Sequence, residues 1–333
     1  MPTQTRQTSR GEPRLAGVEW LRLIACLGIV AFHAQVPGGQ IALGGLPAFT
    51  ILTVALAVRS ARGRRWLDFA SARLRTLLAP WLFWSLFYAA ISCYIAHEQG
   101  HPVMSWIQPS TFLIGGFIHL WFLPFALVAT LLVGAFAARG MGTDGTSSPA
   151  STLAYLPWLI LGAAMIPGAT FALERGPIQP PILGETWPAP FEQYLSVIAG
   201  VPLGVALSLI PSGDPRGWGR LALFSALTIA VCVALIFTGH NKIAIPDLVA
   251  VATCPIAWGL PIRADERTLR WSRLSYGVYL LHPFFALIGY KFIMPHFGSL
   301  SAAAAHWLHA GAIGAMSLAG TWVARKTPLV RVV

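Results

Sequence analysis

Charged residues are scarce in this sequence. Only 11% of its 333 residues are charged and 56% are hydrophobic, whereas a soluble domain carries about a quarter charged residues. This scarcity excludes an ordinary soluble domain. Apolar runs of about 18 to 22 residues recur along the whole chain, which is the length that crosses about 30 Å of hydrocarbon. We therefore predict an all-α, polytopic integral membrane protein.

Cysteine and asparagine are also rare, and their placement excludes several kinds of site. The four cysteines lie in apolar segments without paired spacing, which argues against a disulfide framework and against a zinc site. We accordingly expect no metal and no tightly bound cofactor. No Gly-x-Ser-x-Gly nucleophile elbow occurs. The single asparagine, Asn241, lies in a predicted outer loop, which disfavours a membrane site built on an Asn–His pair.

Ten apolar segments are predicted to be membrane helices, at about 16–36, 39–58, 76–96, 117–138, 152–172, 191–210, 218–238, 243–260, 273–293 and 302–323. If the N-terminus lies inside and the helices alternate, only Arg175, Lys242 and Lys291 of the 23 basic residues fall outside. Basic loops remain on the cytoplasmic side. The asymmetry therefore predicts about ten helices with both termini cytoplasmic, and it explains the net charge of +11 without a nucleic-acid partner.

The first predicted helix carries three ionisable residues on one face. Glu19 and Arg22 are three apart and can pair. Eleven residues separate Arg22 from His33, which at 100° per residue returns to within about 20° of the same direction. Taken alone, Arg22 is also explained as an interfacial arginine that snorkels to the membrane surface. His33 taken alone is also explained as a histidine with a packing role. Ionisable residues inside a membrane are costly, so three aligned groups favour a functional site.

Several segments resemble the acyltransferase-3 family of membrane O-acyltransferases. Glu19, Arg22 and His33 are similar to its first-helix signature, although the acidic residue there is usually Asp. Residues 119–123 (HLWFL) look like a second family motif, and residues 275–283 (SYGVYLLHP) resemble its C-terminal motif. The matches occur in the family's order and cover nearly the whole chain.

Two further segments resemble the family with departures. Arg73 and Arg75, ahead of Pro80, are similar to its paired-arginine segment. They are two apart where the family has three, so on an α-helix we expect their side chains to splay. Thr53 and Val54 stand where the family usually has Ser-Gly, which changes either a close backbone packing or a substrate contact.

The resemblance implies transfer of an acyl group, most often acetyl, from cytoplasmic acyl-CoA to a hydroxyl of an envelope polysaccharide or lipid-linked sugar. The expected location is the bacterial cell inner membrane. The implied catalytic residues are His33 as general base, Arg22 to stabilise charge and Glu19 to orient Arg22. Acyl-CoA, the acceptor and membrane lipids are the expected partners. The implied substrate-binding residues are Arg73, Arg75, His119, Trp121, Tyr279 and His282.

Other functions and a second catalytic route stay open. A proton-coupled exporter would use Glu19, Arg22 and His33 as a relay, and such transporters usually show a two-fold repeat, which is not visible here. A non-catalytic subunit of a glycan-assembly complex is another alternative. Within an enzyme, Cys26 shares a helix face with Arg22 and His33 and could carry the acyl group, although buried cysteines are normally unreactive.

The charge pattern predicts a cytoplasmic tail at 1–15, a membrane domain at 16–323 and a second cytoplasmic tail at 324–333. It also places the loop around Gly145 inside and the loop around Gly184 outside. A cysteine introduced at Gly184 should react with a membrane-impermeant maleimide in intact cells, and one introduced at Gly145 should not. The opposite labelling pattern would show that the helix count is wrong.

Overall fold

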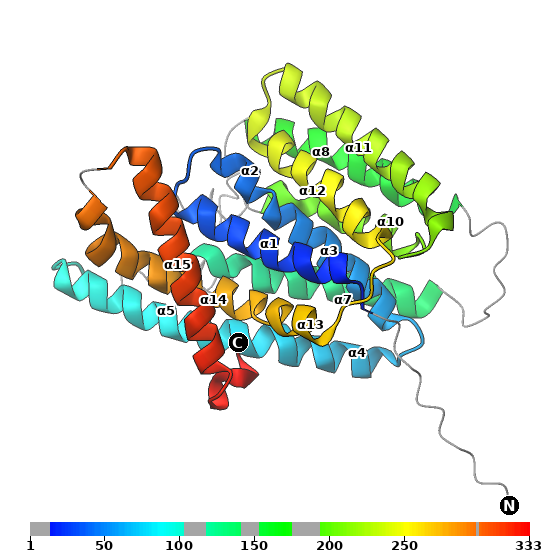
Figure 1. Cartoon of the computed structure of the whole chain (residues 1–333). Coiled ribbons are helices and arrows are strands. Elements are labelled where there is room, and N and C mark those ends of the chain that lie inside the picture. The colour runs from blue at the N-terminus through cyan, green and yellow to red at the C-terminus, as the bar shows by residue number, and fades with distance from the viewer. Residues whose placement is uncertain (1–13, 103–117, 141–152, 175–193, 298–299) are drawn as a thin grey trace, which may run out of the picture.

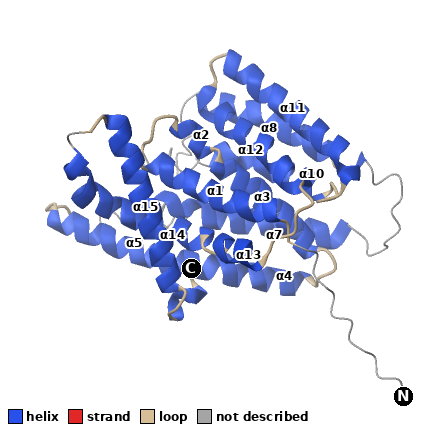
Figure 2. Cartoon of the chain, viewed as in Figure 1, coloured by secondary structure: helices blue, strands red, loops and turns tan. Residues whose placement is uncertain are grey.

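The computed structural model describes residues 14–102, 118–140, 153–174, 194–297 and 300–333. Every regular element in these ranges is a helix, as Figures 1 and 2 show. The only β-type pairing within them is an isolated antiparallel bridge between Leu15 and Arg263. The predicted all-α class is confirmed.

The described helices form one bundle around α1 and α3 (Figure 1). α1 contacts α3, α12, α13, α14 and α15, whereas α3 contacts α7, α10 and α12. The long helices are α1 (Ala16–His33), α3 (Gly45–Ala61), α5 (Ala79–Glu98), α7 (Phe122–Gly140), α8 (Leu156–Glu174), α11 (Trp218–Phe237), α12 (Asn241–Gly259), α14 (Ser275–Ile288) and α15 (Ala302–Ala324). The shorter α-helices are α2 (Gly39–Leu43), α4 (Trp66–Arg73), α10 (Gly200–Ser208) and α13 (Glu266–Ser272).

Each of the ten predicted membrane segments overlaps a helix of the structure. Eight stretches of the described chain are long and apolar enough to cross a membrane. The predicted sixth segment corresponds to a shorter apolar helix, Tyr194–Ser208, and the predicted tenth to α15. A polytopic membrane protein is thus shown, while the count of ten crossings and the cytoplasmic termini stay predictions.

The helix containing Pro80 begins earlier than predicted. Helical structure runs without a break from α4 through a π-helical turn, Leu74–Leu78, into α5. Proline has no N–H, so Pro80 cannot bond the carbonyl of Thr76 one turn back. The hydroxyl of Tyr276 in α14 donates to that carbonyl instead, at 3.2 Å. The helix therefore continues through Pro80 with a π-helical turn just before it, because a neighbouring helix satisfies the freed carbonyl.

Small residues let α10 approach α3 closely. A Cβ atom on Gly204 would lie 2.6 Å from the carbonyl oxygen of Ile51 and 2.7 Å from Cβ of Val54. A Cβ atom on Gly200 would lie 2.9 Å from Cβ of Thr50. The two glycines are four residues apart and so share one helix face, a spacing typical of tight helix packing in membranes.

Gly204→Ala should destabilise the protein, because the added methyl group meets the backbone of α3. Forcing extra volume into a packed interior costs about 1–3 kcal/mol. We expect a melting temperature several degrees lower for the detergent-solubilised protein, measured by tryptophan fluorescence. Gly219→Ala is the matched control, because nothing lies within 4 Å of the position of its added Cβ. An equal loss in both variants would contradict the close approach of α3 and α10.

Candidate active site

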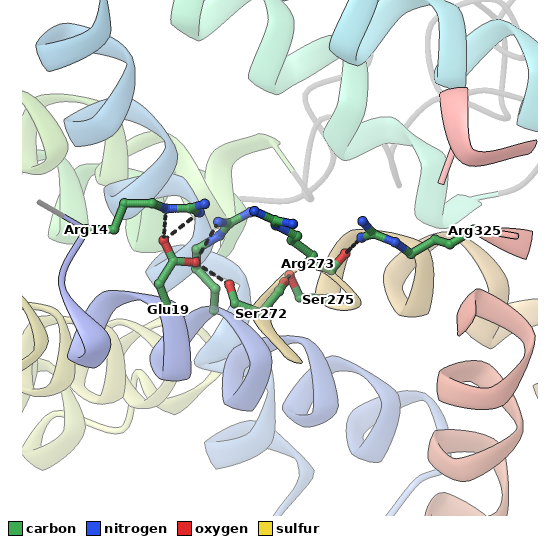
Figure 3. A network of polar contacts seen from close by, with 7 residues as sticks. Arg14, Glu19, Ser272, Arg273, Ser275 and Arg325 are labelled. Atoms are coloured by element: carbon green, nitrogen blue, oxygen red, sulfur yellow. Dashed lines mark hydrogen bonds and ion pairs between the residues drawn. The ribbon is translucent and has the colours of Figure 1, made fainter. Parts of the chain in front are cut away.

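The carboxylate of Glu19 is the centre of a buried polar network (Figure 3). The side chain is 3% exposed. It accepts from Nε of Arg14 at 2.7 Å and from Nη1 of Arg22 at 3.2 Å, and the hydroxyl of Ser272 also donates to it. The Glu19–Arg22 pair predicted from the spacing is present. Arg14 and Ser272 were not predicted as partners, since no local spacing connects Ser272 with α1.

The network continues along the junction between α13 and α14. The Ser275 hydroxyl donates to the Ser272 carbonyl at 2.7 Å, and the thiol of Cys26 donates to the Ser275 carbonyl at 3.1 Å. Further out, Nη1 of Arg325 donates to the carbonyl of Arg273 at 2.9 Å. These bonds connect the start of α1 to the start of α14 and the end of α15.

A cavity of about 540 Å³ opens beside this network. No Asp or Glu of the described chain lines it. Arginine side chains from α1, α4, the π-helical turn and three other segments converge on it, so the cavity is suited to an anion with several charged oxygens. The six arginines are Arg14, Arg22, Arg73, Arg75, Arg273 and Arg331.

Arg73 and Arg75 both line this cavity, although they were expected to splay. Arg73 lies over the ring of Phe69, 5.0 Å from its centroid, and Arg75 donates to the backbone and hydroxyl of Ser71. Long side chains beside a π-helical turn can thus reach one cavity from positions two apart. Thr53, at the departure from the family pattern, also lines the cavity.

Three histidines from distant parts of the sequence come together behind the cavity. The ring centroids of His33 and His282 are 5.1 Å apart, and those of His282 and His119 are 5.5 Å apart. His119 and His282 are buried, whereas His33 is partly exposed. No group of three or more potential metal ligands occurs in the described residues. Imidazole commonly shuttles protons in enzymes, so the cluster is a candidate for proton transfer.

Pro283 fixes the orientation of His282. Because proline lacks an N–H, the carbonyl of Tyr279 loses its partner in the helix. Nδ1 of His282 donates to that carbonyl at 2.7 Å. A carbonyl only accepts, so Nδ1 carries a hydrogen, and in the neutral ring Nε2 keeps its lone pair. Within the described chain this Nε2 has no hydrogen-bond partner.

The hydroxyl of Tyr88 in α5 bridges two backbone groups in the neighbouring turn of α14. It donates to the carbonyl of Leu280 at 2.7 Å and accepts from the backbone N–H of Phe284 at 3.3 Å. The same ring meets His119 edge-on, with centroids 4.9 Å apart. Tyr88 thus holds two of the histidine-bearing segments. The sequence offered only a weak signal for it, a polar hydroxyl in an apolar helix.

Tyr279 connects the cavity to the histidines. Its side chain lines the cavity, and its hydroxyl donates to the backbone carbonyl of His119. Its ring centroid lies 6.0 Å from both His119 and His282. Tyr279 therefore contacts both the cavity and two of the three histidines.

Not every predicted residue reaches this site. Trp121 packs against Phe122, Phe125 and Tyr194 and does not line the cavity. Cys26 is fully buried and does not line it either. Neither observation supports an acyl carrier at Cys26.

One buried acidic residue was missed by the sequence analysis. Asp247 of α12 is 2% exposed, and its Oδ2 has no hydrogen-bond partner in the described chain. It does not line the arginine-lined cavity. A carboxylate inside a predicted membrane helix is the signal that should have singled it out.

The family model described as an acyltransferase domain (Acyl_transf_3) matches residues 15–326. The chain belongs to the acyltransferase-3 family. Comparisons with curated proteins and with solved structures gave no match. The matched range of this membrane acyltransferase includes Glu19, the three histidines and four of the six cavity arginines, and leaves out Arg14 and Arg331.

Glu19→Gln should lower both the stability and the activity of this acyltransferase. The amide keeps the shape but removes the charge that Arg14 and Arg22 share, and a hydrogen bond to a charged group is worth on the order of 2 kcal/mol. We expect a melting temperature lower by several degrees. Glu98→Gln, at an exposed position of α5, is the control and should match the wild type. An unchanged melting temperature in Glu19→Gln would contradict a central role for this carboxylate.

Proposed function

We propose that this acyltransferase moves an acyl group, most simply acetyl, from cytoplasmic acyl-CoA to a hydroxyl of an envelope polysaccharide or a lipid-linked sugar. Its proposed location is the bacterial inner membrane. The observation that carries the proposal is the cavity lined by six arginines and by no Asp or Glu of the described chain, with Tyr279 in contact with both the cavity and the rings of His119 and His282.

The cavity suits the donor by charge and by position. The basic residues around it belong to segments predicted to lie on the cytoplasmic side, where acyl-CoA is made available. Guanidinium groups match the paired oxygens of phosphate, so the arginines at the cavity would attract the phosphate-bearing donor to this side of the protein. The thioester would then lie deeper, near Arg22 and Tyr279, both of which line the cavity.

His33 is the proposed general base. It would take the proton of the acceptor hydroxyl as that oxygen attacks the thioester carbonyl. A C–O bond forms, the C–S bond breaks, and the proton passes to the departing sulfur to give free CoA. Proton transfer of this kind contributes about 10² to 10⁴ in rate. Arg22, oriented by Glu19, would stabilise negative charge during donor binding and transfer.

The acceptor is proposed to arrive from the outer end of α1. His33 closes that helix, and its backbone carbonyl accepts from the hydroxyl of Tyr290 at 3.2 Å. The carbonyl of the next residue, Ala34, accepts from Nδ1 of His306 at 2.9 Å. Both partners fix the backbone at this helix end, so that His33, the partly exposed histidine of the cluster, is held toward the outer side.

Transfer is tested with the purified full chain in detergent, by measuring free thiol released from acetyl-CoA with and without envelope extract. His33→Ala should retain less than about a tenth of the wild-type rate, given the usual size of general-base catalysis. Arg22→Lys should also fail, because an ammonium group cannot reproduce a two-pronged contact.

Cys26→Ala is the matched control for His33→Ala. It removes a side chain from the same helix but not from the histidine cluster, so near-normal thiol release is expected. Substantial activity in His33→Ala would remove His33 as the base. Substrate movement across vesicles without thiol release would support the exporter instead of the transferase.

A further inference from the structure

A second, larger hollow lies between α13 and the end of α15. Its volume is about 800 Å³. It is distinct from the arginine-lined cavity but shares one wall residue with it, Arg273. We call it the α13–α15 groove.

The groove carries more positive charge than the surrounding chain neutralises. Glu266 is the single acidic residue that lines it. The ion pairs found in the described chain involve Arg14, Arg22 and Glu19, none of which lines the groove. The positive-inside rule accounts for basic residues on the cytoplasmic side, but it does not require them to line one hollow. The basic lining residues are Arg267, Arg270, Arg273, Arg325 and Lys326.

Two of these cations are held in place, and two indole rings flank them. Arg325 donates to the Arg273 carbonyl at 2.9 Å (Figure 3), and Nζ of Lys326 lies 3.2 Å from the ring centroid of Trp322. Trp271 and Trp322 line the groove and are 40% and 55% exposed. Exposed aromatic faces among cations favour stacking of a nucleobase beside its phosphates.

We propose that the α13–α15 groove binds the 3′-phosphoadenosine 5′-diphosphate end of the CoA donor, which rests on the proposed function. A 3′-phosphate alone carries about −1.5 to −2 charge at pH 7. The adenine would lie against Trp271 or Trp322, with the phosphates among the five cations. From there the pantetheine arm passes Arg273 into the arginine-lined cavity and brings the thioester toward Tyr279.

An anionic lipid headgroup shares the phosphate chemistry and also collects at basic residues near the inner surface. The shared wall residue Arg273 makes the two hollows neighbours, which favours the nucleotide, because the reacting end of the same donor belongs in the adjacent cavity. The two exposed indole rings also favour the nucleotide, because a flat base can stack on them.

Binding is measured first, by calorimetry with adenosine 3′,5′-bisphosphate and the full chain in phosphatidylcholine nanodiscs. The wild type should bind, and Arg270→Gln and Trp322→Leu should each bind on the order of tenfold more weakly, the usual effect of losing a charge-assisted bond or a stacking partner. Arg216→Gln and Trp218→Leu are the matched controls, exposed and outside both hollows, and should bind as the wild type does.

Steady-state kinetics then separate the nucleotide end from the reacting end. The groove variants should raise the KM for acetyl-CoA on the order of tenfold with kcat unchanged, since they remove binding made equally in ground and transition states. Their KM for acetyl-pantetheine, which has no nucleotide, should equal that of the wild type. Normal turnover of this short donor also shows that the variants are folded.

Each proposal can fail alone. Equal acetyl-CoA KM values in all variants, with transfer intact, overturn the groove assignment. The same holds if phosphatidylglycerol displaces the bisphosphate and the groove variants lose only lipid dependence. Bisphosphate binding that depends on Arg270 and Trp322, without any thiol release, overturns the proposed transfer and leaves the nucleotide site standing.

Discussion

The buried carboxylate of Glu19 is the interaction on which the rest of the site depends. An ionised group at 3% exposure is tolerable only when it is paired, and Glu19 meets this need with Arg14, Arg22 and Ser272. Those bonds fix α1 against the α13–α14 junction. His33 lies fourteen residues further along the same rigid helix, about 21 Å away. By fixing the start of α1, the carboxylate also determines where His33, at the other end of the helix, lies relative to His282.

Prolines determine the local geometry on the other side of the site. Pro80 frees the carbonyl of Thr76, which Tyr276 then binds, and Pro283 frees the carbonyl of Tyr279, which His282 then binds. In both cases a missing N–H in one helix creates an acceptor that orients a polar side chain. The two prolines thereby create the carbonyl acceptors that orient Tyr276 and His282.

Much of the architecture was predictable, because membrane helices are set by length and hydropathy. The Glu19–Arg22 pair was predictable too, since it depends on spacing within one helix. The meeting of His33, His119 and His282 was not, because it depends on how three helices pack and on contacts such as that of Tyr88 with Leu280. The common cavity of Arg73 and Arg75 was missed because a π-helical turn is invisible to a pattern that assumes 3.6 residues per turn.

The excess of guanidinium groups around the arginine-lined cavity has a consequence for the resting protein. Two of the six, Arg14 and Arg22, share the carboxylate of Glu19, and the other four lack an acidic partner in the described chain and repel each other. Mobile anions from the surrounding solution screen this repulsion between turnovers. A charged substrate must then displace these ions as it enters, so its apparent affinity becomes a function of ionic strength. The cell's salt and phosphate levels would in this way tune how readily the cavity fills.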